Sequence, residues 1–194
     1  MLFARVQTIF LLSCFHIAAA SLLPTGVIFP LYIYPDGNCS VWSELLDSIA
    51  EYDTLPFYVI VNPSSGPGDE NSQPDASYQT CIAELLNTGS NVHAVGYVLT
   101  DYGSRSEQDV LADIATYAQW DSDYRPSGIF FDQASYSASE VSTYTTYAEN
   151  ARSSFSDALV ILNPGTATDS GYYAIADLIV TTENDYDSFR CVQI

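Results

Sequence analysis

The run Gly128-Ile129-Phe130-Phe131-Asp132-Gln133 passes directly from apolar residues to a carboxylate. A parallel strand that is buried on both faces reads as a continuous apolar run rather than an alternating one. In α/β proteins the polar groups at the carboxyl ends of such strands line one crevice or barrel mouth. The segment therefore predicts a buried strand whose carboxyl end places Asp132 in such a crevice or barrel mouth.

Five other apolar runs end in the same way. With the first run they predict six strands: Val27–Tyr34, Phe57–Asn62, Val92–Thr100, Gly128–Asp132, Leu159–Asn163 and Leu178–Thr182. Residues with helical spacing separate most of them, for example Trp42, Leu45, Leu46 and Ile49. Strand starts recur about every 30 residues, the length of a strand–helix unit, and the shorter last interval predicts a brief helix there.

Alternation of strands and helices leaves two architectures, a (β/α)8 TIM-type barrel and an open doubly wound parallel sheet. Six units favour the open sheet by count. Against it, no Gly-rich phosphate-binding motif follows any of the strands. On these residues alone both architectures stay open.

The amino terminus predicts export. Arg5 precedes an apolar stretch that runs to Ala18-Ala19-Ala20, and small residues before Ser21 fit a signal-peptidase site. We expect residues 1–20 to be a signal peptide, residues 21–194 to form one domain, and the protein to be secreted, extracellular or cell-wall-associated. The leader is too short to span a membrane comfortably, and no later run approaches a spanning length.

The chain is strongly acidic. It carries 24 acidic residues against five basic ones, a formal net charge of −19. Such a surface repels phosphates, so we expect neither nucleic acid nor an anionic membrane as a partner. A neutral or cationic ligand is favoured, although an acidic surface also serves solubility alone. We expect a monomer.

Three cysteines remain after removal of the leader. Cys39 and Cys81 lie near the starts of segments that follow successive strands, so we expect these two to pair and Cys191 to stay free. We expect no metal and no cofactor, because the chain has no CxxC motif and His93 stands at the start of a strand. That position also argues against a Ser–His–acid triad.

Two carboxylates at strand ends are the minimal equipment for glycoside hydrolysis, and Asp132 and Glu183 are the candidates. An Asp after a strand often caps the next helix instead, and a loop Glu is common in so acidic a chain. Tyr32, Tyr34 and Tyr97 offer flat rings for the C–H faces of sugars. The other strand-end candidates for substrate contacts are Asn62, Asp101 and Gln133.

Four segments together resemble the spherulation-specific, spherulin-4-like family. They are Pro30-Leu31-Tyr32-Ile33-Tyr34-Pro35, Val61-Asn62-Pro63 with Gly66-Pro67-Gly68, Gly96 to Gly103, and Gly128-Ile129-Phe130-Phe131-Asp132. The resemblance runs from about Val27 to about Asp187 and implies a (β/α)8 barrel, here ending after the sixth unit. It also implies a secreted hydrolase that cleaves α-1,4-linked galactosamine or N-acetylgalactosamine polysaccharide, a cationic polymer when deacetylated.

The resemblance assigns catalysis to an Asp-Glu pair after the fourth strand and a Glu after the sixth. Asp132 and Glu183 match two of these positions, whereas Gln133 stands where the pair has its Glu. Glutamine can hydrogen-bond a sugar but cannot act as an acid or base. Two functions stay open: a polysaccharide hydrolase that uses Asp132 and Glu183, and a catalytically inactive carbohydrate-binding or cell-surface protein on the same scaffold.

Export generates a first prediction. Mass spectrometry of protein collected from the culture medium should place Ser21 at or near the amino terminus, because the small residues at 18–20 form the cleavage site. A mature chain that retains Met1 would contradict the signal peptide.

Overall fold

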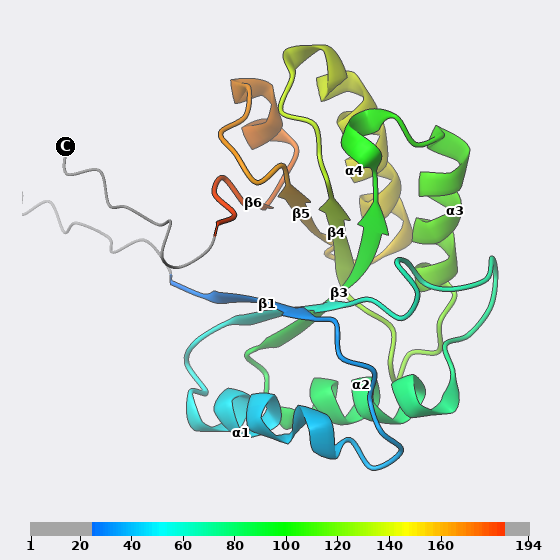
Figure 1. Cartoon of the computed structure of the whole chain (residues 1–194), viewed down its shortest axis with the longest axis vertical. Helices are drawn as coiled ribbons and strands as arrows, with labels where there is room; N and C mark the ends of the chain where they lie inside the picture. The colour runs from blue at the N-terminus through cyan, green and yellow to red at the C-terminus, as the bar shows by residue number, and fades with distance from the viewer. Residues whose placement is uncertain (1–24, 185–194) are drawn as a thin grey trace, which may run out of the picture.

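The computed structural model describes residues 25–184, and its centre is one sheet of six parallel strands in chain order. The strands are β1 (Val27–Leu31), β2 (Phe57–Val61), β3 (Val92–Leu99), β4 (Gly128–Asp132), β5 (Leu159–Asn163) and β6 (Leu178–Ile179). Figure 1 shows that the sheet curls from β1 to β6 into part of a barrel wall.

The helices follow the strands along the chain. They are α1 (Ser43–Glu51), α2 (Ala76–Thr88), α3 (Glu107–Ala118) and α4 (Val141–Ser154), with 3-10 turns η1 (Ser40–Trp42), η2 (Asp101–Gly103), η3 (Ala138–Glu140) and η4 (Ser170–Ala174). Figure 1 shows α1 to α4 on the outer side of the curl. Only the short η4 lies between β5 and β6, as the short interval predicts.

This arrangement is the curled half-barrel of a (β/α) barrel fold, so the barrel prediction is confirmed and the alternative of an open doubly wound sheet is wrong. A doubly wound sheet reverses its strand order and carries helices on both faces. Here the strand order follows the chain from β1 to β6 with parallel pairing throughout.

Alternate residues of the strands build two hydrophobic clusters. The outer cluster lies between the sheet and the helices and includes Val59, Val98, Phe131 and Leu162, all at most 1 % exposed. The inner cluster comprises Ile60, Val95, Tyr97, Phe130 and Ile161. Because side chains alternate along a strand, Asp132 and Asn163 follow Phe130 and Ile161 on the inner side.

Four of the six predicted strands extend too far. β1 ends at Leu31 because its last partner in the register is Val61, the last residue of β2, and the chain then turns so that Trp42 Nε1 donates to the carbonyl of Ile33. β6 has two residues, Leu178 and Ile179, because only these pair with β5. β2 and β3 end one residue earlier than predicted, whereas β4 and β5 match their predicted bounds.

Side-chain caps fix where two helices begin. Asp75 accepts hydrogen bonds from the backbone N–H groups of Ser77 and Tyr78 at the start of α2. Ser106 accepts from the N–H of Asp109 at the start of α3, whose first turn also carries Glu107. Caps satisfy donors that have no partner within the helix, and acidic residues in the first turn favour the helix dipole.

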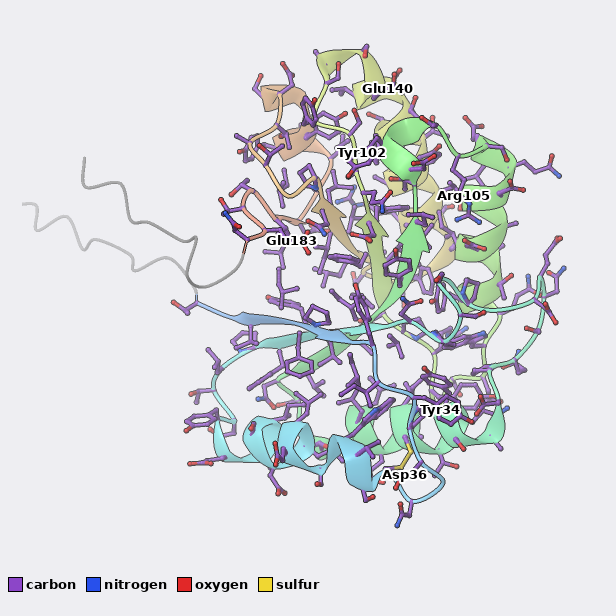
Figure 2. The ribbon with its side chains drawn as sticks, viewed as in Figure 1. Tyr34, Asp36, Tyr102, Arg105, Glu140 and Glu183 are labelled. Carbon is purple, nitrogen blue, oxygen red and sulfur yellow. A yellow bond between two sulfur atoms is a disulfide. The ribbon has the colours of Figure 1, made fainter. Side chains whose placement is uncertain are left out.

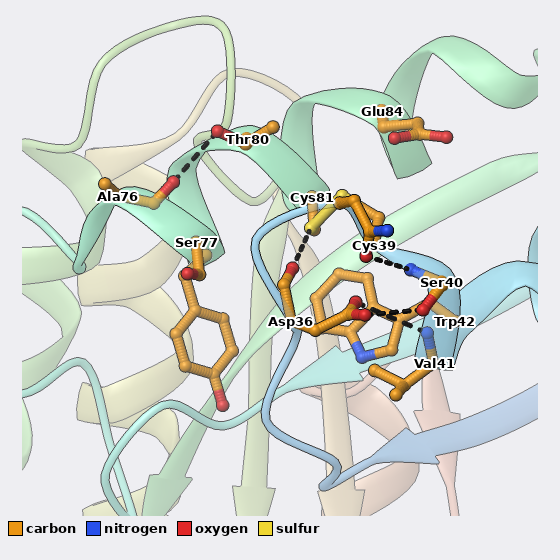
Figure 3. The surroundings of a disulfide bond; sticks show 12 residues. Asp36, Cys39, Ser40, Val41, Trp42, Ala76, Ser77, Thr80, Cys81 and Glu84 are labelled. Carbon is orange, nitrogen blue, oxygen red and sulfur yellow. Dashed lines mark hydrogen bonds between the residues drawn. A yellow bond between two sulfur atoms is a disulfide. The ribbon is translucent and has the colours of Figure 1, made fainter.

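One disulfide joins the first two strand–helix units, and it is the predicted Cys39–Cys81 pair. Cys39 lies in the loop after β1 and Cys81 on α2, with 42 residues of sequence separation (Figure 3). Both residues are at most 2 % exposed. The bridge therefore fastens the loop from β1 to the outer helical layer, while Cys191 lies outside the described residues.

Replacement of both half-cystines by alanine should lower the free energy of unfolding. A covalent loop of this length removes about 4 kcal/mol of chain entropy from the unfolded state. Urea denaturation of oxidised wild type, reduced wild type and the Cys39→Ala/Cys81→Ala variant tests this. Reduction should destabilise the wild type and leave the variant unchanged; equal stability of all three would contradict a stabilising bridge.

Candidate functional site

Asp132 is the last residue of β4, on the inner side of the curl. The register of the sheet aligns it with Leu99 of β3 on one side and Asn163 of β5 on the other. Neighbouring strands of a parallel sheet lie about 5 Å apart. The side chains of Asp132 and Asn163 are therefore set side by side at the barrel mouth by backbone pairing alone.

Both oxygens of the Asp132 carboxylate accept hydrogen bonds from uncharged donors. The Tyr97 hydroxyl donates to Oδ2 at 2.7 Å, and Asn163 Nδ2 donates to Oδ1 at 2.8 Å. These two neutral donors fix the orientation of the Asp132 carboxyl group. Partial burial and the hydrogen bond to Asp132 raise the pKa of Tyr97, so this hydroxyl keeps its proton at neutral pH.

Asn163 connects Asp132 to Glu183. The same Nδ2 group donates to Glu183 Oε2 at 2.9 Å, and the backbone N–H of Gly165 donates to Asn163 Oδ1 at 3.1 Å, which fixes the orientation of the amide. Two oxygens that share one donor nitrogen at these distances lie less than about 6 Å apart, close to the separation of paired carboxylates in retaining glycosidases. The structure thus brings the two predicted acids together.

Glu183 reaches the site from a loop rather than from a strand. β6 ends at Ile179, and the backbone N–H of Glu183 then donates to the carbonyl of Gly165 at 3.3 Å. Its side chain is exposed, whereas Asp132 is half-buried. Figure 2 shows Glu183 in the loop that follows β6.

Two acidic side chains meet here, and within residues 25–184 neither of them forms an ion pair with a basic residue. The two ion pairs of the described chain, Arg105–Asp113 and Arg152–Asp177, leave Asp132 and Glu183 unpaired with a base. Partial burial, followed by the charges of Asp132 and Glu183, raises the pKa of Tyr32. The Tyr32 phenol therefore stays protonated beside the two acids.

A hollow of about 210 Å³ opens next to the acids. Its walls are Ile28, Pro30, Tyr32, Ile60, Phe130, Asn163, Val180 and Glu183. The exposed ring of Tyr32 stands edge-on to Tyr97, with 5.8 Å between ring centroids. The hollow thus combines an apolar and aromatic wall with the Glu183 carboxylate and the Asn163 amide, a combination suited to the face of a sugar ring.

The turn after β4 is held by a buried hydroxyl network. Gln133 has a positive φ of 48°, and its carbonyl accepts from the Tyr102 N–H at 2.7 Å and from Thr100 Oγ1 at 2.9 Å. Thr100 Oγ1 also lies 2.7 Å from the Tyr144 hydroxyl, which accepts from the Ser135 N–H. Burial raises the pKa of Tyr144 to about 12. The backbone is fixed, while the Gln133 side chain is exposed beside Asp132.

The other predicted contacts are placed less favourably. Tyr34 packs edge-on against Tyr78 of α2 at 5.4 Å, and Figure 2 shows it near Asp36, well away from Glu183. Asn62 Oδ1 accepts from the Gly66 N–H at 2.9 Å and so shapes its own loop. Asp101 is exposed in η2 with a positive φ of 47°.

Sequence reasoning missed Asn163 as a site residue. The signal was present in the run that ends at Asn163-Pro164-Gly165, but an Asn at such a position also fits a simple turn. His93, expected in a core or edge role, stacks on Tyr58 at the opposite end of its strand.

Residues 25–184 contain neither a metal-binding cluster nor a membrane-spanning helix. No group of three or more His, Cys, Asp or Glu side chains is placed there to hold a metal ion. None of the helices in this range has the length and apolar character needed to cross a membrane.

Comparisons with known proteins agree with the fold. Spherulin-4 of Physarum polycephalum is 43% identical over 170 residues, which cover 87% of this chain and 48% of that protein. The chain thus spans about half the length of this relative. The crystal structure of Aspergillus clavatus Sph3 in complex with GalNAc matches with a TM-score of 0.79 and 34% identity, covering 86% of this chain and 68% of that one. The profile of spherulation-specific family 4 matches residues 26–193, and the chain belongs to this family.

Proposed function

We propose that the protein is a secreted glycoside hydrolase that cleaves α-1,4-linked galactosamine or N-acetylgalactosamine polysaccharide. The observation that carries the proposal is the pair of carboxylates, Asp132 and Glu183, held on one Asn163 amide at the barrel mouth. The GalNAc bound to Aspergillus clavatus Sph3 supports an amino-sugar ligand. The buried disulfide supports an oxidising, extracytoplasmic environment.

We assign a different catalytic role to each of the two acids. Asp132 accepts hydrogen bonds at both oxygens and is oriented by Tyr97 and Asn163, so we assign it as the nucleophile toward the anomeric carbon. We assign Glu183, the other carboxyl group at the mouth, as the acid that enters the reaction with a proton and protonates the glycosidic oxygen as the bond breaks. It then removes a proton from the water that releases the sugar from Asp132. Their short separation favours retention over inversion.

The charge of the protein suits this substrate. A net charge of −19 attracts a polymer whose deacetylated units carry ammonium groups. The Asn163 amide that donates to both acids is neutral, so it adds no positive charge that would repel this polymer. Acetylated units are neutral and find the apolar wall that Tyr32 and Phe130 provide.

Removal of either carboxylate should abolish most of the activity. Asp132→Asn and Glu183→Gln keep size and shape but lose the nucleophile or the acid, so kcat on galactosaminogalactan should fall by about a hundredfold or more. Release of new reducing ends measures the rate. The matched control is Glu84→Gln, an exposed glutamate on the outer surface of α2, and it should keep full activity.

Wild-type protein that releases no reducing ends would contradict the hydrolase. A loss in Asp132→Asn accompanied by a lower unfolding midpoint would indicate structural damage instead, so thermal unfolding of each variant accompanies the assay.

A second function, carbohydrate binding without catalysis, is favoured by Gln133. The side chain is exposed beside Asp132 and stands at the position where the family motif carries an acid. In this alternative the protein retains the sugar-binding wall of Tyr32 and Tyr97 but has lost its acid–base group. It would bind the polysaccharide and leave it intact.

The variant Gln133→Glu separates the two functions. Because Asp132 and Glu183 already form a closely spaced pair, a third carboxylate should change kcat by less than about threefold. Reducing-end release by the purified variant and wild type, compared across pH, measures this. A gain of a hundredfold from an inactive wild type would show that residue 133 must be acidic, and would favour the binding function for the natural chain.

A further inference from the structure

A second hollow lies between the loops that follow β3 and β4. It has a volume of about 580 Å³, and Tyr102, Ser135, Tyr136 and Ser137 line it. Pockets for small ligands have volumes of roughly 300–1,000 Å³. The Tyr102 and Tyr136 side chains are 53% and 57% exposed, so large areas of aromatic ring face solvent here.

Hydrogen bonds fix the backbone that carries Tyr102. Its φ is 55°, a conformation that bulky side chains rarely adopt. The Tyr102 N–H donates to the Gln133 carbonyl at 2.7 Å and holds this conformation. The ring of Tyr102 is therefore presented from a rigid turn.

The loop that carries Tyr136 is equally constrained. The Tyr136 carbonyl accepts from the Asp169 N–H at 3.1 Å, and the next carbonyl, of Ser137, accepts from the Tyr172 hydroxyl at 2.9 Å. The Ser137 N–H donates to Ser135 Oγ at 3.2 Å. Two aromatic rings on rigid loops lose little conformational entropy when they bind a ligand, which favours binding.

One of the two loops that line the hollow begins directly after Asp132. Tyr136 follows Asp132 by four residues, and the Gln133 carbonyl contacts Tyr102 directly. Figure 2 shows Tyr102 above the tips of the central strands and Glu183 to the lower left of it, in the loop after β6. A polymer that enters the acid site can thus extend over Gln133 toward the two tyrosines.

The charge around the hollow restricts its occupant. Asp101 precedes Tyr102 and is exposed, and Glu140 lies against Gly103. Arg105 is nearby in sequence, but its guanidinium is engaged by Asp113 at 2.6 Å and by the Leu99 carbonyl at 2.9 Å. An acidic sugar would be repelled, whereas a neutral or amine-bearing sugar would be accepted.

We propose that the Tyr102–Tyr136 hollow is a separate sugar-binding subsite that holds a further unit of the same neutral or amine-bearing polysaccharide. The proposal rests on the proposed function for the identity of the polymer. The rings cover the C–H faces of a sugar, and Ser135 and Ser137 offer hydroxyl groups at the wall. A short oligosaccharide cannot reach both the acid pair and the subsite, so the affinity of the protein for the polysaccharide should rise with the length of the sugar chain.

Binding to the full-length Glu183→Gln variant tests the subsite without cleavage. Calorimetry would use a disaccharide and a hexasaccharide of α-1,4-linked N-acetylgalactosamine, the de-N-acetylated hexasaccharide, and oligogalacturonate. The hexasaccharides should bind roughly tenfold more tightly than the disaccharide, and Tyr102→Ala/Tyr136→Ala should remove this gain. Phenylalanine at both positions should restore it, because the rings remain.

The matched control is Tyr52→Ala. Tyr52 has the same exposure as Tyr102, 53%, but follows α1 at the opposite end of the barrel. It should leave the hexasaccharide affinity unchanged. Retention of the chain-length gain in the double alanine variant, or tight binding of oligogalacturonate, would overturn the subsite. Tyrosine-dependent binding by a wild-type protein that cleaves nothing would sustain the subsite and refute the hydrolase.

Discussion

Pairing of the parallel strands in chain order, in matched register, is the constraint on which the site depends. Leu99, Asp132 and Asn163 occupy one level of three adjacent strands. A shift of one residue in β5 would turn Asn163 toward the helices and place Leu162 at the mouth, since side chains alternate along a strand. The site is thus positioned by the same backbone hydrogen bonds that form the sheet.

One neutral donor, the Asn163 amide, keeps two carboxyl groups together at this level. The Asn163 amide donates to both carboxylates, and the Gly165 N–H fixes the orientation of the amide. An arginine in the same place would also attract both acids, but it would repel a cationic substrate. The amide therefore allows the two acids to stay close while the mouth remains negative, which agrees with the acidic composition of the whole chain.

The presence and positions of the strands could be predicted from the sequence because each buried strand is a continuous apolar run, whereas the barrel order was implied only by the family resemblance. β4 and β5 match their predicted bounds, since a polar residue ends each of them. The ends of β1 and β6 could not be predicted, because they depend on where the partner strand stops. The apolar pattern of one segment does not show where the strand beside it in the sheet ends.

The site was predicted where chemistry is local and missed where it depends on distant contacts. Asp132 and Glu183 were identified from strand-end position and family motif, and the structure brings them together. Tyr34 fits the same sequence rule, but it packs against Tyr78, 44 positions further along the chain. Asn163 was overlooked because its role depends on a carboxylate 20 residues away, whereas its own sequence context fits a turn.

The Cys39–Cys81 bridge also changes what a break in the chain would do. It closes a covalent ring that contains all of β2 and the Gly- and Pro-containing stretch from Ser64 to Gln73. Most of that stretch is exposed, and exposed loops are where proteases cut first. A protease that cuts inside the ring would produce two fragments that the disulfide still joins, one of which carries β1 and the other β3. A nicked molecule would therefore keep the first strand of its barrel, which would matter most in the protease-rich extracellular environment proposed above.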